Sequence, residues 1–287
     1  VGKEQLEYHN VKATSTPFRG YMHWNINPEV FALGPLSIRY YGLLFAAAFF
    51  TGFIIIRRIY VEEGKPEVDL DSLLTHVMIG TIAGARLGHC LFYDPVHYLT
   101  HPIQILKVWE GGLASHGGAI GIFTALYIYT RKHSDQPYLW MLDRMVIVTA
   151  LAGLFIRTGN FLNSEILGVP TDVPWAVVFA RIDAVPRHPA QLYEALAYGS
   201  ISVGLYKTYT RFRATTPSGL LLGLFLVMVF TFRFFIEFVK ERQAAYGTDL
   251  PLSVGQLLSI PLVLLGFVLL FQAFRSLQLT DSQDVVE

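Results

Sequence analysis

A dense group of polar residues directly follows an apolar run in the middle of the chain. The run covers residues 145–156, and the group after it reads Arg-Thr-Gly-Asn-Phe-Leu-Asn-Ser-Glu. A charged side chain at the centre of a membrane helix costs about 2.5 to 3.5 kcal/mol, and less towards the helix ends. If the helix continues, Arg157, Asn160 and Ser164 lie at i, i+3 and i+7 and share one face. That face would present a fixed cation beside amide and hydroxyl donors.

The alternative for this group is an arginine that extends to the membrane interface, followed by a helix cap. The polar residues are denser than a cap needs, so we favour function or pairing inside a helix bundle. Arg233 and Glu237 are four residues apart and can pair on one helix, which explains them as well as a function does. The other ionisable residues at membrane depth are Arg39, Arg86 and Glu194.

His116 stands in the sequence Ser-His-Gly-Gly at the predicted start of a helix. Glycines let a ligand approach the backbone, and a helix N-terminus offers free N–H groups to an anion. The positive end of the helix dipole disfavours an imidazolium, and a neutral imidazole can act as a general base near neutral pH. The alternative is a hydrogen-bonded histidine at the membrane interface.

Other kinds of catalytic site are not indicated. His116 and His188 could together bind a metal, but no closely spaced ligands or HExxH motif supports this. Neither a GxSxG motif nor a phosphate-binding loop of the P-loop type is present in the sequence. We therefore predict that the protein uses no metal and no cofactor.

The composition predicts an integral membrane protein. The chain has 287 residues, of which 53% are hydrophobic and 15% are charged, against about 25% charged in a typical soluble domain. The mean hydropathy is +0.42. The formal net charge is zero, so nothing indicates a nucleic-acid partner. The single cysteine, Cys90, lies in an apolar segment and is interpreted as a small buried hydrophobe.

The apolar runs predict an all-α fold with seven transmembrane helices, since a spanning helix needs about 20 mostly apolar residues. The third run is the least regular, because it begins with glycines. Glycines at four-residue spacing in the second and sixth runs are interpreted as packing devices. The predicted spans are 36–56, 72–93, 113–130, 141–158, 190–209, 217–239 and 254–274.

Basic residues predict the orientation of these spans. They follow spans one, three, five and seven, and the positive-inside rule makes that side cytoplasmic. The N-terminus would then lie outside and the C-terminus inside. The residues on the predicted inner side are Arg57, Arg58, Lys65, Arg131, Lys132, Lys207, Arg211, Arg213 and Arg275. Longer segments on the opposite side carry Lys107, Arg181, Arg187, Lys240 and Arg242, so the rule is supported but not cleanly.

The same pattern gives a domain organisation. Residues 1–35 form an extracytoplasmic segment, 36–274 the membrane domain and 275–287 a cytoplasmic tail. Residues 160–188 contain several prolines and a possible short strand at 177–179, and they are long enough for a small extracytoplasmic cap. Residues 1–21 show no signal peptide and precede the first methionine, Met22; an upstream extension and a cloning remnant both remain open.

Several stretches together resemble the prolipoprotein diacylglyceryl transferase family of bacterial membrane enzymes. The family signature Arg-x-Gly-Asn-Phe-x-Asn-x-Glu stands at residues 157–165 and is followed by Gly168. One departure is Ile-Arg-Thr at 156–158, where the family usually has Gly-Arg-Leu, and it affects only local packing. The resemblance runs from residue 41 to residue 261, and its other motifs lie at 84–88, 109–112, 115–118, 187–189, 191–194, 232–233, 237–238 and 255–256.

The resemblance implies a reaction and the residues that carry it. The family transfers diacylglycerol from phosphatidylglycerol to the lipobox cysteine thiol of a preprolipoprotein and releases glycerol phosphate. His116 matches the proposed general base, and Arg157 and Arg233 match the two essential arginines. The implied substrate-binding positions are Tyr41, Arg86, Asn160, Glu165, Gly168 and Glu237. The implied location is the bacterial inner membrane, with phosphatidylglycerol, the preprolipoprotein signal peptide and the lipid bilayer as partners.

Three other functional classes were weighed. A lipid or small-anion transporter could use the same arginines as a headgroup site, but it predicts inverted repeats that are not visible. An intramembrane protease needs a serine–histidine or paired-aspartate arrangement within the spans, and the sequence suggests none. A non-catalytic scaffold would not need His116 and Arg157 together. The transporter remains the alternative.

Overall fold

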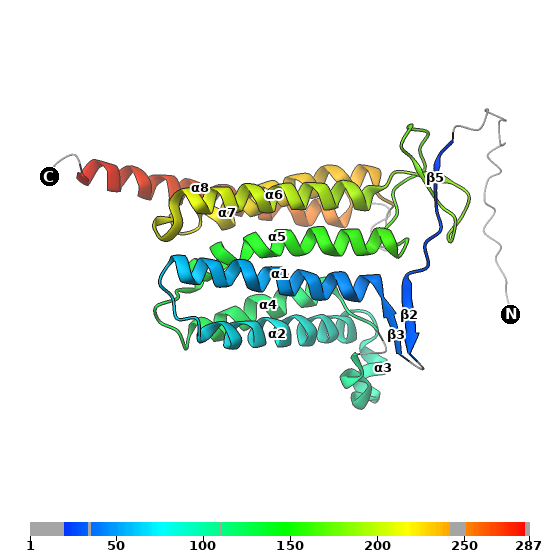
Figure 1. The fold of residues 1–287 in the computed structure, drawn as a ribbon, viewed down its shortest axis with the longest axis horizontal. Coiled ribbons are helices and arrows are strands. Elements are labelled where there is room, and N and C mark those ends of the chain that lie inside the picture. Colours follow the sequence, from blue (N-terminus) through cyan, green and yellow to red (C-terminus); the bar gives the residue numbers. More distant parts are fainter. Residues whose placement is uncertain (1–19, 34–35, 109–110, 242–250, 285–287) are drawn as a thin grey trace.

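The computed structural model describes residues 20–33, 36–108, 111–241 and 251–284. Long helices dominate these ranges and run side by side, with small β-structures gathered at one end of the bundle (Figure 1). Trp109, Glu110, Arg242 and most of the predicted extension at 1–21 lie outside the described residues.

A long helix lies at each of the seven predicted spans. The helices are α1 (Tyr40–Glu62), α2 (Asp69–Phe92), α4 (Ser115–Thr130), α5 (Tyr138–Leu162), α6 (Ala190–Phe212), α7 (Leu220–Ile236) and α8 (Val254–Asp284). Shorter helical turns are α3 (Pro95–Thr100), η1 (Pro102–Leu106), η3 (Arg213–Thr215) and η4 (Glu237–Val239). Among the described residues, four segments are long and apolar enough to cross a membrane: Tyr40–Glu62, Tyr138–Leu162, Leu220–Val239 and Val254–Leu279.

The helices confirm the predicted all-α class, and two small sheets accompany them. One has the order β1-β4-β5, in which β1 (Met22–Trp24) pairs parallel with β4 (Val177–Phe179), and β4 pairs antiparallel with β5 (Pro186–Arg187). The other is the hairpin of β2 (Glu29–Leu33) and β3 (Leu36–Arg39). The possible strand at 177–179 is confirmed. The first helix begins at Tyr40 rather than at residue 36, because the residues before it pair with β2.

Glycines set the distance between α2 and α4, as the four-residue spacing predicts. A Cβ atom on Gly84 would lie 2.4 Å from the carbonyl oxygen of Gly117, and one on Gly80 would lie 2.6 Å from that of Gly121. The two backbones are therefore in direct contact, and any larger residue would separate them. In α7, Gly223 faces Gly266 of α8 in the same way, whereas Gly219 takes a positive φ of 84° as the N-cap.

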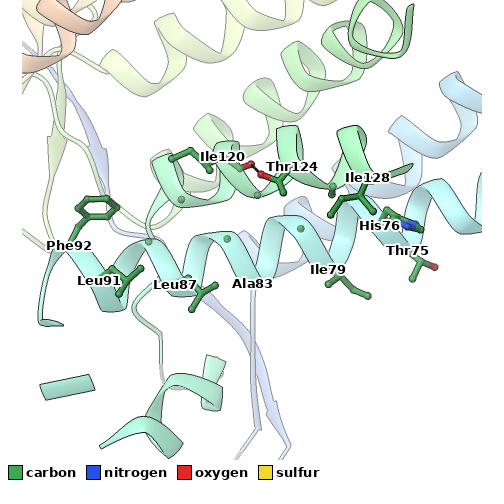
Figure 2. Close-up of a pocket in the computed structure, with 16 residues that line it drawn as sticks. Thr75, His76, Ile79, Ala83, Leu87, Leu91, Phe92, Ile120, Thr124 and Ile128 are labelled. Carbon is green, nitrogen blue, oxygen red and sulfur yellow. Dashed lines mark hydrogen bonds between the residues drawn. The ribbon is translucent and has the colours of Figure 1, made fainter. Parts of the chain in front are cut away.

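An apolar groove of about 470 Å³ follows the outer side of this α2–α4 contact. Its α2 wall includes Ile79, Ala83 and Leu87, and its α4 wall includes Ile120 and Ile128 (Figure 2). Ile79 and Ile120 are more than 60% exposed, so this face of the bundle is open to its surroundings and is apolar.

The end of the bundle opposite the sheets is closed by buried polar contacts. Arg144 of α5 is 1% exposed and pairs with Glu63 at 3.0 Å. Its neighbour Asp143 accepts hydrogen bonds from the backbone N–H groups of Gly219 and Leu222, at 2.7 and 2.8 Å. Asp143 thus caps the first turn of α7 from another helix and fixes how α7 leaves the loop before it.

Candidate active site

Arg157 lies in the last turns of α5, at the end of the bundle that carries the sheets (Figure 1). Its Nε is 3.3 Å from Oε2 of Glu194, and its Nη1 donates to Oδ1 of Asn160 at 3.4 Å. The side chain is 14% exposed, and Nη2 has no hydrogen-bond partner among the described residues. The guanidinium is therefore held at Nε and at Nη1, while the N–H groups of Nη2 remain available to a ligand.

The chain turns sharply after α5 and brings Glu165 back towards Asn160. The helix ends at Leu162, and Ser164 has a positive φ of 57°. Ser164 therefore does not continue the helical face of Arg157, and that expectation is wrong. Instead, Nδ2 of Asn160 donates to Oε2 of Glu165 at 3.1 Å, and Nδ2 of Asn163 donates to Oε1 at 3.2 Å.

Glu194 of α6 joins Arg157 to a residue that the sequence did not single out. Its carboxylate is fully buried, and Oε1 is 3.5 Å from Nζ of Lys240 and 3.3 Å from the hydroxyl of Tyr198. The Lys240 ammonium is also 3.6 Å from Glu237. Burial lowers the pKa of Lys240, and the nearby Glu194 carboxylate opposes this effect. One carboxylate is thus shared by two cations that come from different parts of the chain.

Gly168 holds Lys240 in place through the backbone. The N–H of Val169 donates to the carbonyl of Val239 at 3.0 Å, and the N–H of Glu241 donates to that of Leu167 at 3.1 Å. A Cβ atom on Gly168 would lie 2.3 Å from the carbonyl oxygen of His188, so no larger residue fits between these strands. Gly168 therefore ties the turn after α5 to the residues after α7.

The expected ion pair between Arg233 and Glu237 is not formed among the described residues, because α7 ends at Ile236 and Glu237 starts a 3-10 turn. Glu237 instead accepts a hydrogen bond from Ser253 Oγ at 2.9 Å and approaches Lys240. Arg233 makes no hydrogen bond in the described ranges but lies close enough to help lower the pKa of Lys240. It is a second partly buried cation beside the Arg157 cluster.

Tyr41 belongs to the same end through packing. It lies in the first turn of α1, and a Cβ atom on Gly159 would be 2.8 Å from its Cδ2. The tyrosine ring therefore packs directly on the α5 backbone at Gly159. The structure brings together Tyr41, Arg157, Asn160, Glu165, Gly168, Arg233 and Glu237 of the predicted site, and adds Glu194 and Lys240.

Comparison with known proteins identifies the group to which this chain is related. The sequence profile of the prolipoprotein diacylglyceryl transferase family matches residues 28–272. The chain belongs to this family. It is 50% identical to a phosphatidylglycerol–prolipoprotein diacylglyceryl transferase of Chloroherpeton thalassium over 259 residues, which cover 90% of this chain and 97% of the relative. Proteins of that name from Tolumonas auensis and Bacteroides fragilis are 52% and 42% identical, over 87% of this chain and 96% and 94% of the relatives.

Arg86, which lies in the predicted motif at 84–88, does not join the Arg157 cluster. It is 3% exposed, and its three nitrogens donate to backbone carbonyls of the segment that follows α3. The acceptors are Gln104 at 2.5 Å, Ile105 at 3.0 Å and Gly111 at 2.6 Å. A guanidinium used in this way organises a loop and leaves little for a phosphate. The structure therefore favours a positioning role for Arg86 over direct substrate binding.

His116 lies at the start of α4, at the same end of the bundle as Arg157 (Figure 1). Its side chain is exposed, and no hydrogen bond of it is found in the described ranges. The next residue, Gly117, packs on Gly84 of α2, which fixes the backbone of His116 without using its ring. The described residues also contain no group of three His, Cys, Asp or Glu side chains suited to a metal.

The sequence assigned no role to Glu194 or Lys240, which the structure places beside Arg157. Glu194 was noted as an ionisable residue at membrane depth and as the last residue of the motif at 191–194, and Lys240 only as an exception to the charge rule. The sequence did indicate a possible ion pair for Lys240, because it follows Glu237 by three residues at the end of a predicted span.

Proposed function

We propose that this protein transfers the diacylglyceryl group of phosphatidylglycerol to the lipobox cysteine of a preprolipoprotein. The observation that carries the proposal is the partly buried Arg157, held by Glu194 and Asn160 with donors to spare. The names of the family and its relatives, which specify this transferase, support the same activity. They do not favour the transporter alternative.

The reaction needs one bond to form and one to break. The cysteine sulfur attacks the carbon of the diacylglycerol unit that is bonded to the phosphate oxygen. A carbon–sulfur bond forms as that carbon–oxygen bond breaks. The electron pair of that bond leaves with glycerol phosphate, whose negative charge increases. The thiol must lose its proton, because the thiolate is the reactive form and an ordinary thiol has a pKa of about 8.5.

The two arginines suit the leaving group. Guanidinium remains ionised and can bind two phosphate oxygens at once, and it acts most strongly where water is excluded. Arg157 would hold the phosphate with the N–H groups that Glu194 and Asn160 leave free. Arg233, which has no described hydrogen bond, would bind a further oxygen. Both stabilise charge that develops only as the bond breaks.

His116 is the residue we assign to removal of the thiol proton. Its exposed imidazole can meet a cysteine that approaches from outside the bundle. Tyr41, Asn160 and Glu165 would shape the headgroup site, and Glu237 would act through Lys240. Gly168 would contribute through its backbone position.

The chain would cross the bacterial inner membrane seven times. The three helices that fall short of a simple span, α2, α4 and α6, lie against the four that are apolar enough, and the apolar α2–α4 groove would face lipid (Figure 2). In this arrangement the sheet-bearing end, with its cap at 160–188, and the N-terminal segment 1–35 would lie outside. The opposite end, with Arg57, Arg58 and Lys65, and the tail at 275–287 would lie in the cytoplasm.

The test is an assay with purified components. The protein in detergent or vesicles is incubated with phosphatidylglycerol and a lipobox peptide, and glycerol phosphate and the thioether product are measured together. A peptide with serine in place of the lipobox cysteine is the control. Release of glycerol phosphate with the cysteine peptide but not with the serine peptide supports the transferase. Absence of the thioether product contradicts it.

A further inference from the structure

Lys240 and Glu194 form a buried charge pair that the reaction scheme does not require. Glu194 is fully buried and Lys240 is 5% exposed in its side chain. Neither side chain is open to solvent as Arg157 is, so direct contact with the phosphate is not their evident role. Buried ion pairs are often no more stabilising than apolar packing, which raises the question of what this pair does.

The contacts give an answer. Glu194 approaches Arg157 with Oε2 at 3.3 Å and Lys240 with Oε1 at 3.5 Å. If Arg157 were the only partner of this carboxylate, its charge would be largely neutralised in a site with little water. A second cation on the other oxygen divides the attraction, so the arginine keeps a net positive field towards an anion.

We propose that Lys240 is a positioning residue that sets the effective charge of Arg157 through Glu194. Glu194 fixes the Nε edge of the guanidinium, and Lys240 balances Glu194 so that the arginine stays electropositive. The proposal rests on the proposed function of Arg157 as the phosphate ligand. It adds two residues, from the first turns of α6 and from the segment after α7, to the determinants of headgroup affinity.

The backbone supports this role. Lys240 is held by the hydrogen bonds that join residues 167–169 to residues 239–241, and Gly168 lies in that same backbone pairing. The segment at 167–169 follows directly on the turn that carries Glu165. The Lys240 ammonium and the Arg157 guanidinium, which share Glu194, are therefore both attached to the end of α5 and the turn that follows it. Glu237 lies 3.6 Å from the ammonium and is itself held by Ser253, which limits how far Lys240 can move.

The proposal makes opposite predictions for the two partners. Lys240→Met leaves Glu194 to Arg157 alone, and we expect the inhibition constant of glycerol phosphate and the KM for phosphatidylglycerol to rise about tenfold or more. Glu194→Gln keeps a hydrogen-bond acceptor beside Nε but removes the negative charge, so glycerol phosphate should inhibit more strongly than in the wild type. A purely structural role predicts that both variants change in the same direction.

Two further variants guard against misfolding. Lys240→Arg keeps the charge and should remain within about threefold of the wild type, and the double variant Lys240→Met/Glu194→Gln should recover much of the lost glycerol phosphate inhibition. Lys207→Met removes an exposed lysine from α6 and is the matched control. Equal inhibition constants for Lys240→Met and the wild type, or no recovery in the double variant, would overturn the proposal. Failure of the proposed function is distinct, because the wild type itself would then form no thioether.

Discussion

Replacement of Arg157 by lysine separates phosphate stabilisation from simple charge attraction. A guanidinium has five N–H donors; in Arg157 one on Nη1 donates to Asn160, and Nε forms an ion pair with Glu194 at 3.3 Å. The donors that remain can meet two oxygens of a phosphate in fixed directions. A lysine ammonium keeps the charge, but it is a single point with no planar fork, and Glu194 would claim one of its donors.

The expected loss follows from the number of donors removed. One preorganised donor at a developing negative charge is worth about 2.7 to 4 kcal/mol, so Arg157→Lys should lower kcat by about 10² to 10³-fold. Binding of the ground-state headgroup depends mostly on charge, so the KM for phosphatidylglycerol should change by less than about tenfold.

The assay measures thioether formation on a lipobox peptide and, separately, binding of phosphatidylglycerol. Arg181→Lys is the matched control, since Arg181 is exposed and its described hydrogen bond is a single long one to the carbonyl of Ile26. Near-normal thioether formation by Arg157→Lys would refute the catalytic role of this arginine. Equal losses in binding and turnover would point instead to a damaged headgroup site.

Further predictions concern the base, the backbone, pH and topology. His116→Gln should lower turnover by about 10² to 10⁴-fold with phosphatidylglycerol binding retained, and full glycerol phosphate release would assign the base elsewhere. Gly168→Ala should cost about 1 to 3 kcal/mol in unfolding experiments and reduce activity, because the new methyl group meets the His188 carbonyl. Arg187 lowers the pKa of Asp183, so this pair stabilises the fold above about pH 4 and loses its effect as pH falls through the lowered value. Melting temperature should therefore fall less steeply with acid in Asp183→Asn than in the wild type. Cysteine at position 172 should react with an impermeant reagent from outside and cysteine at position 211 should not, and the reverse would invert the topology.

The sequence predicted the helices well because their signal is local. Runs of apolar residues and their breaks gave a long helix at each expected place, and the glycine spacing in α2 predicted a close helix contact, whose partner the structure shows to be α4. The errors at element ends have local causes too. The first helix starts late because residues 36–39 pair with β2, and this pairing cannot be seen from hydropathy alone.

The candidate site was predicted less completely because its contacts join distant segments. Glu194 and Lys240 are 46 residues apart, so neither helical periodicity nor local spacing indicates their contact. The same limit explains Glu237, which was paired with its helical neighbour Arg233 but contacts Lys240 and Ser253 after the helix ends. The positive φ at Ser164 likewise takes this residue off the helical face on which the period of 3.6 had placed it with Arg157 and Asn160.

The hydrogen bonds that the arginines already make show why the candidate site is at one end of the bundle and not the other. Arg86 gives its donors to backbone carbonyls, and Arg144 gives Nε and Nη2 to Glu63 while being 1% exposed. Both are buried, Arg86 has all three nitrogens occupied, and the Nη1 of Arg144, which lacks a partner in the described ranges, is closed off from solvent, so both are suited to holding structure. Arg157 is also anchored, but only at Nε and Nη1, and 14% of its side chain is exposed. Arg233 has no described hydrogen bond to give up. Free donors on partly exposed cations are what an incoming phosphate needs, and in the described ranges these two arginines supply them at the end where α5 and α7 finish.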